Sequence, residues 1–140
     1  MTTIAFDGKT LAADCMGDNA GIKRRVVKIE RFGDALLAMT GAHDSAVELR
    51  EWFKGGADPK DFPASAREDV ATLIVFLSDG IFAYGKSPIP VQFFERKCAF
   101  GSGRDYAEAA MFLGCDAAKA VEVACHFDVY SGLGVVTLEF

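Results

Sequence analysis

The chain has 140 residues, 51% of them hydrophobic, which suits a single domain spanning residues 1–140 with a substantial core. Its formal net charge of −5 argues against nucleic acid or an anionic membrane as the main partner. The sequence has no Cys-x-x-Cys pair, no apolar signal stretch and no apolar run of membrane-spanning length, so we expect a cytoplasmic protein with four free thiols.

The first part of the chain is predicted to form short strands around a tight turn. Asp7-Gly8 is a two-residue hairpin signal, and pairing across that turn brings Asp14 back beside the chain start. A turn at Gly33-Asp34 separates two further strands. The four predicted strands cover residues 3–6, 10–13, 26–32 and 35–39.

The hydrophobic period then changes to that of a helix. Ser45-x-x-Glu48 is a capping-box pattern, and apolar residues at helical spacing follow before Gly55-Gly56. Residues 57–69 contain two prolines and are predicted to be a loop.

The second half of the chain predicts strands, a pair of helices and a final strand. Asp116 can cap the second helix, whose small-residue stripe indicates close packing on a sheet. The predicted strands cover residues 70–77, 81–84, 93–100 and 135–140, and the first helix covers 105–113. Because hairpins dominate and helices are grouped, this order favours an α+β fold, a four-layer αββα sandwich with antiparallel sheets.

Thr2 is a candidate nucleophile. Removal of Met1 would give this residue both a hydroxyl and a free α-amine, and an α-amine with a pKa of roughly 7.7–8.0 can take the proton from its own Oγ. A competing motif, Gly101-x-Gly103, follows a predicted strand as a dinucleotide-binding turn would. Tyr106 stands where the third glycine should be, and the preceding hairpins are not a βαβ unit.

Several motifs, in order, resemble the β-type proteasome subunits and the bacterial HslV peptidase. They are Thr2-Thr3-Ile4, Leu11-Ala12-Ala13-Asp14, Val27-Lys28-Ile29, Met39-Thr40-Gly41-Ala42, Phe100-Gly101-Ser102-Gly103 and Asp128-Val129-Tyr130-Ser131-Gly132. The resemblance implies the N-terminal-nucleophile (Ntn) hydrolase fold, here with one helix layer reduced because a single helix lies between Gly41 and Val70.

The resemblance also implies a threonine-type endopeptidase with Thr2 as nucleophile. Lys28 would keep the amine unprotonated, and Asp14 would pair with Lys28. Gly41 would supply the oxyanion N–H, while Ser102, Asp128 and Ser131 would orient the amine. Met39 and His43 would line the substrate pocket. No cofactor is required, although relatives hold Na⁺ on backbone carbonyls, which corresponds here to Cys125, Asp128 and Ser131.

The implied partners are peptide or unfolded protein substrates, further copies of the chain in a homo-oligomeric ring, and an AAA+ unfoldase. Two alternatives stay open. One is a non-catalytic assembly or binding protein that keeps the fold, and the other is an Ntn amidohydrolase that acts on small amides.

Overall fold

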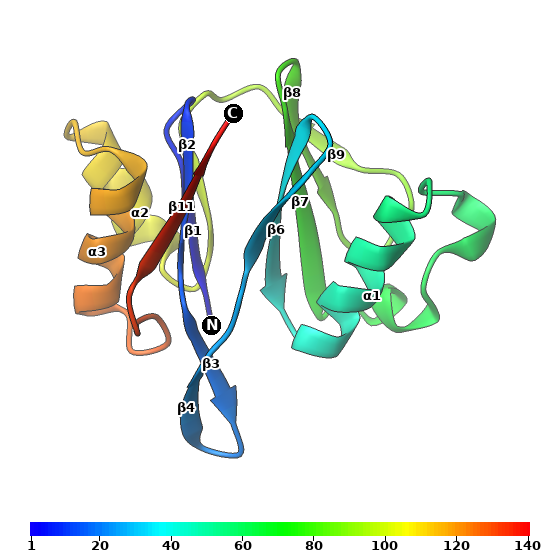
Figure 1. Ribbon diagram of the computed structural model, residues 1–140, viewed down its shortest axis with the longest axis horizontal. Coiled ribbons are helices and arrows are strands. Elements are labelled where there is room, and N and C mark those ends of the chain that lie inside the picture. The colour runs from blue at the N-terminus through cyan, green and yellow to red at the C-terminus, as the bar shows by residue number, and fades with distance from the viewer. The chain divides into compact units, whose positions relative to one another are not determined.

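The computed structural model describes residues 1–140, which divide into two compact units (Figure 1). The first unit contains Met1–Glu30 and Glu95–Phe140, and the second contains Arg31–Phe94. Each unit is built on its own β-sheet, with its own helices. The assignment of residues 1–140 to one domain stays a prediction.

The sheet of the first unit has the strand order β10-β1-β2-β11. The strands are β1 (Thr3–Phe6), β2 (Thr10–Asp14), β10 (Cys98–Gly101) and β11 (Val135–Glu139), and all neighbours are antiparallel. The Asp7 carboxylate accepts hydrogen bonds from the Lys9 and Thr10 N–H groups and fixes the predicted turn. Pairing of Ile4 with Ala13 then brings Asp14 beside Thr3, as predicted.

Helices α2 (Arg104–Phe112) and α3 (Ala117–Phe127) pack on this sheet. The Asp116 side chain accepts a hydrogen bond from Lys119 N at 2.8 Å, which confirms the predicted cap. The small residues of α3 form a buried cluster with Ala5 and Ala12 of the sheet, so the stripe serves close packing, as predicted.

A two-stranded ribbon, β3 (Met16–Asn19) and β4 (Ile22–Arg25), extends from the first unit (Figure 1). The prediction of one strand over residues 26–32 is therefore wrong, because β5 covers Ile29–Phe32 and Lys28 lies in the bend between β4 and β5. All four residues of β4 are exposed, including the basic run of Lys23, Arg24 and Arg25.

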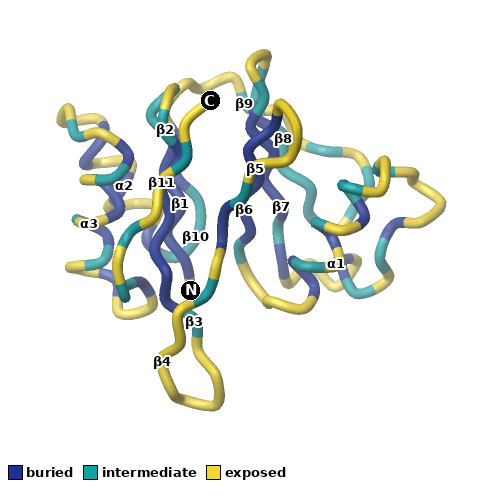
Figure 2. Tube along the Cα trace, in the orientation of Figure 1, coloured by how far each residue is buried: buried dark blue, intermediate teal, exposed yellow.

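The second sheet has the strand order β5-β6-β7-β8-β9. Its further strands are β6 (Ala35–Gly41), β7 (Ala71–Leu77), β8 (Gly80–Tyr84) and β9 (Val91–Phe93). Helix α1 (His43–Lys54) contacts β6 and β7, and Leu49 and Trp52 pack on Leu37 and Leu73 in the core of this unit. Strands β6 and β7 are mostly buried (Figure 2).

Three details of this part of the prediction are wrong. Helix α1 begins at His43, so Ser45 lies inside its first turn rather than at its N-cap, and Glu48 accepts a hydrogen bond from Ser65 instead of closing a capping box. The predicted loop over 57–69 contains two 3₁₀ helices, η1 (Pro59–Asp61) and η2 (Ala64–Glu68). The predicted strand over 93–100 is two strands, β9 and β10, which belong to different sheets.

None of the helices combines the length and the apolar character needed to cross a bilayer.

Candidate active site at the start of strand β1

Thr2 is a buried residue immediately before β1, with only 4% of its surface exposed. Its backbone N–H donates a hydrogen bond to Ser102 Oγ at 3.0 Å, and its carbonyl accepts one from Gly103 N at 3.3 Å. A Cβ at Gly101 would lie 2.1 Å from that carbonyl oxygen, so the close approach of the turn requires glycine there. The Gly101-Ser102-Gly103 turn therefore holds the backbone of Thr2.

Lys28 and Asp14 form a buried ion pair beside Thr2. Lys28 Nζ lies 2.8 Å from Asp14 Oδ1, and neither residue is more than 6% exposed. Removing one partner of such a pair leaves an uncompensated buried charge, which is strongly destabilising. The bend between β4 and β5 thus places the ammonium against the end of β2.

Backbone N–H groups satisfy the rest of the Asp14 carboxylate. Oδ1 also accepts from Thr3 N at 2.9 Å, and Oδ2 accepts from Met16 N at 3.2 Å and Gly132 N at 3.0 Å. A fully hydrogen-bonded carboxylate can remain charged inside a protein. Asp14 therefore anchors Lys28 and, at the same time, joins three separate backbone segments around the site.

The Lys28 ammonium and the Thr2 hydroxyl bind the same atom. Thr2 Oγ1 donates to the Met1 carbonyl oxygen at 2.6 Å, and Lys28 Nζ donates to that oxygen at 3.3 Å. The hydroxyl and the ammonium are therefore neighbours at the carbonyl group that precedes Thr2. Burial lowers the pKa of the Met1 α-amine, and the Lys28 ammonium lowers it further.

A second carboxylate, Asp128, lies behind Ser102. Asp128 Oδ2 accepts hydrogen bonds at 2.6 Å from both Ser102 Oγ and Ser131 Oγ, and Oδ1 accepts one from Tyr130 N. Burial alone would raise the pKa of Asp128, but these hydrogen bonds favour the carboxylate and hold its pKa below the ordinary value. Asp128 is thus linked through Ser102 to the backbone nitrogen of Thr2.

Thr3 belongs to this cluster, although the sequence analysis assigned it no role. It is completely buried, its N–H donates to Asp14, and its hydroxyl lies 2.7 Å from Ser131 Oγ. One feature of the sequence could have indicated its role. Thr3 is the single hydroxyl-bearing residue of the short strand Thr3–Phe6, whose other residues are apolar.

The remaining predicted site residues, Met39, Gly41 and His43, belong to the second unit. Met39 is a member of its hydrophobic core, and His43 is the exposed first residue of α1. Gly41 has φ +89°, and a Cβ there would lie 2.3 Å from the Val70 carbonyl oxygen, so local packing already requires glycine. The oxyanion and pocket roles stay predictions.

The predicted sodium position lies where α3 ends. The Asp128 carbonyl accepts a hydrogen bond from Ser131 N at 3.2 Å, and burial raises the pKa of the Cys125 thiol to about 11. The bend therefore brings together the backbone of two of the three predicted residues, and the ion itself stays a prediction.

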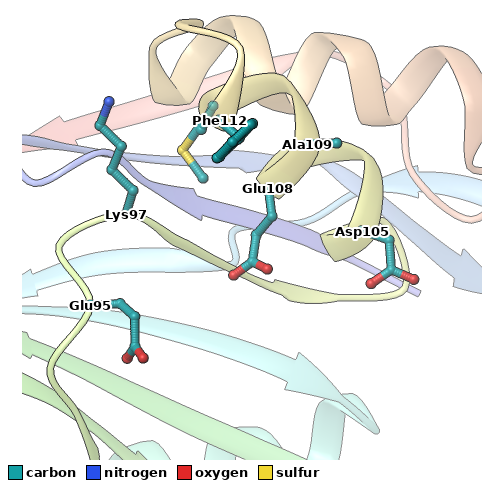
Figure 3. Close-up of a pocket in the computed structure, with 7 residues that line it drawn as sticks. Glu95, Lys97, Asp105, Glu108, Ala109 and Phe112 are labelled. Atoms are coloured by element: carbon teal, nitrogen blue, oxygen red, sulfur yellow. The ribbon is translucent and has the colours of Figure 1, made fainter.

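A pocket of the first unit lies elsewhere, between α2 and the segment that precedes β10 (Figure 3). It has a volume of about 550 Å³ and is lined by acidic, basic and apolar side chains: Glu95, Lys97, Asp105, Glu108, Ala109, Met111 and Phe112. None of these is a predicted site residue. A mainly apolar pocket of about 330 Å³ lies between residues 25–29 and β11, next to Lys28 in the chain.

Comparisons with known proteins bear on the fold. No protein-family model and no curated protein matches the chain. The structure is similar to that of Thiobacillus denitrificans BPH in complex with Epoxomicin, with 23% identity, a TM-score of 0.75, and coverage of 100% of this chain and 98% of that chain. A second BPH structure has 23% identity and a TM-score of 0.72 over 99% of this chain and 96% of that one.

Eukaryotic HslV from Trypanosoma brucei is similar as well, with 22% identity and a TM-score of 0.72 over 99% of each chain. At these identities the comparisons show the fold. The chain therefore has an HslV-like fold of the proteasome β type, which confirms the α+β class with antiparallel sheets predicted from the sequence.

Proposed function

We propose that the chain is a threonine-type endopeptidase with Thr2 as its nucleophile. The observation that carries the proposal is the convergence of the Thr2 hydroxyl and the Lys28 ammonium on the Met1 carbonyl oxygen. A hydroxyl, a fixed cation and a site for an α-amine are the parts that this chemistry needs, and an HslV-like fold agrees with it.

Removal of Met1 would convert the Thr2 backbone nitrogen into a free amine. That nitrogen already donates to Ser102 Oγ at 3.0 Å, so Ser102 would hold the amine in place. The Lys28 ammonium would disfavour the protonated amine and keep it available as a base near neutral pH. Asp14 would hold Lys28 in the geometry that this effect requires.

The reaction would then proceed in two stages. Thr2 Oγ attacks the peptide carbonyl carbon while its proton passes to the α-amine and on to the leaving amine, which leaves an ester between Thr2 and the acyl half of the substrate. Water then attacks that ester, and the amine again accepts and returns the proton. A backbone N–H at Gly41 is the predicted donor to the oxyanion in both stages.

The proposal extends to assembly. We expect copies of the chain to form a closed ring, with an AAA+ unfoldase supplying unfolded substrate. The support is the HslV-like fold alone, and size measurements on the purified protein test it.

Turnover of a fluorogenic peptide tests the function directly. The protein is first checked by intact mass for loss of Met1, and Thr2→Ala is compared with Thr2→Ser. We expect Thr2→Ala to abolish turnover, because it removes the nucleophile, and Thr2→Ser to retain part of it. We also expect Epoxomicin, which Thiobacillus denitrificans BPH binds, to inhibit the wild type.

Two outcomes would contradict the proposal, and each would favour a different function. A chain that begins at Thr2 but neither cleaves peptides nor reacts with a threonine-directed inhibitor would be the non-catalytic assembly or binding protein. Turnover of small amides without turnover of peptides would indicate the amidohydrolase.

A further inference from the structure

The hydroxyl groups around Asp128 have a fixed hydrogen-bond direction. Ser102 Oγ and Ser131 Oγ both lie 2.6 Å from Asp128 Oδ2, and a carboxylate oxygen can only accept. The Ser102 hydroxyl also lies 3.3 Å from the Thr2 carbonyl oxygen, but the shorter bond to a charged carboxylate is the stronger one, so each serine directs its single hydrogen to Asp128. Each serine oxygen keeps lone pairs that can accept one further bond.

These lone pairs are filled by the first two threonines of the chain. Ser102 Oγ accepts from Thr2 N at 3.0 Å. Ser131 Oγ lies 2.7 Å from Thr3 Oγ1, and because the Ser131 hydrogen is already used, Thr3 is the donor of that bond. The network thus runs from Thr3 through Ser131 to Asp128, and from Thr2 through Ser102 to the same oxygen.

We infer that Thr3 is a positioning residue that couples the two carboxylates of the site. Its N–H holds Asp14, the partner of Lys28, while its hydroxyl supports Ser131 and through it Asp128. This inference rests on the proposed function, since what Thr3 positions is the nitrogen of Thr2 relative to Lys28.

The Thr3 hydroxyl is enclosed by protein atoms. Thr3 is completely buried, so water cannot replace Ser131 as its acceptor. Gly103 faces it so closely that a Cβ there would lie 1.9 Å from Thr3 Oγ1. In a buried chain of hydroxyl groups each bond polarises the next, so the Thr3 donor strengthens the bond from Ser131 to Asp128.

The test compares Thr3→Val with Thr3→Ser. Valine keeps the shape and the N–H bond to Asp14 but removes the hydroxyl, whereas serine keeps the hydroxyl. We expect Thr3→Val to lower kcat about tenfold with KM nearly unchanged, and Thr3→Ser to restore most of the rate. Equal kcat values for Thr3→Val and the wild type would overturn the inference.

A second readout does not depend on turnover. The Asp128 carboxyl group is titrated by carbon NMR in the wild type and both variants. Neither substitution alters the other groups that influence this carboxyl group, which include Ser102, Ser131 and the chain-terminal α-amine. We expect the pKa of Asp128 to rise in Thr3→Val, because the carboxylate loses part of its hydrogen-bond support, and to stay unchanged in Thr3→Ser. An identical titration in Thr3→Val and the wild type overturns the inference even if the protein cleaves nothing.

A double-mutant cycle with Ser131→Ala separates this role from a general loss of packing. If Thr3 acts through Ser131, Thr3→Val has no further effect on the Asp128 titration once Ser131 is alanine. Additive shifts would overturn the inference. If Thr3→Val fails to fold, Thr3→Ala takes its place in the cycle. If the wild type cleaves no peptide but the shifts in the Asp128 titration are not additive, the result counts against the proposed function. Thr3 would then still be the link between the two carboxylates.

Discussion

Lys28 Nζ lies 2.8 Å from Asp14 Oδ1, and Asp14 is completely buried. The two partners are unequal in their other contacts. Asp14 also accepts three backbone N–H bonds, whereas the other described contact of Lys28 Nζ is the Met1 carbonyl at 3.3 Å. Loss of Asp14 would therefore leave the larger set of buried groups without partners.

We predict that Asp14→Asn destabilises the fold by about 3–5 kcal/mol, because a buried ammonium loses its counter-ion and an amide NH₂ meets backbone donors. Lys28→Met should cost less, since the carboxylate keeps its three N–H bonds, yet it should still abolish turnover. Denaturant unfolding measures both, with the exposed Asp18→Asn as the control. A larger loss for Lys28→Met than for Asp14→Asn would contradict the assignment of Asp14 as the anchor.

Ser102→Ala should lower kcat by roughly 10- to 100-fold, because the variant removes both the acceptor for the Thr2 nitrogen and a charge-assisted bond to Asp128. Ser65→Ala is the matched control, since Ser65 also bonds a carboxylate, that of Glu48 in the second unit. Peptide turnover is compared at saturating substrate. Equal losses in both variants would show that Ser102 has no particular part in the reaction.

Gly103→Ala should destabilise the fold by about 1–3 kcal/mol, because its Cβ would collide with Thr3 Oγ1 and press on Ala124. Gly85→Ala is the control, since the nearest atom to its Cβ would be at 3.6 Å, an ordinary contact. Thermal unfolding of both variants measures the difference. A Gly103→Ala protein as stable as Gly85→Ala would mean that the turn does not press against Thr3.

We predict that the buried Cys98 thiol lowers the free energy of unfolding at alkaline pH. Burial first, then Glu108 and Glu95, raise its pKa to about 12 in the folded protein, whereas an unfolded thiol ionises near 8.5. Between these values the unfolded chain binds fewer protons, so the free energy of unfolding falls as pH rises, by up to about 1.4 kcal/mol per pH unit. Cys98→Ala should flatten this slope between pH 9 and 11 in denaturant titrations. If the slope is unchanged in the variant, other groups cause the pH dependence.

The sequence predicted the position of Asp14 because a two-residue turn fixes the register of a hairpin, and register decides which residue lies opposite Thr3. The N-cap of α3 at Asp116 could also be predicted from the sequence, because one side chain and one nearby N–H define it. Local chemistry of this kind needs no knowledge of the rest of the fold.

The errors arose where distant contacts decide the structure. Strand β4 is exposed along its whole length, so its sequence has no alternation of apolar and polar residues. The hydrophobic pattern therefore could not predict the β3–β4 ribbon. Ser45 and Glu48 fit a capping box by spacing, but Glu48 bonds Ser65 instead. Thr3 was missed because its role depends on Ser131, 128 positions away in the chain.

The most direct test of the account is an intact-mass measurement after treatment with a peptide β-lactone, an electrophile that acylates a nucleophilic hydroxyl. For a chain that begins at Thr2 we predict one acyl adduct per chain, located on Thr2 by fragmentation and absent from Thr2→Ala. An unmodified Thr2 in that chain, or an adduct that persists in Thr2→Ala, would contradict the assignment of Thr2 as the nucleophile.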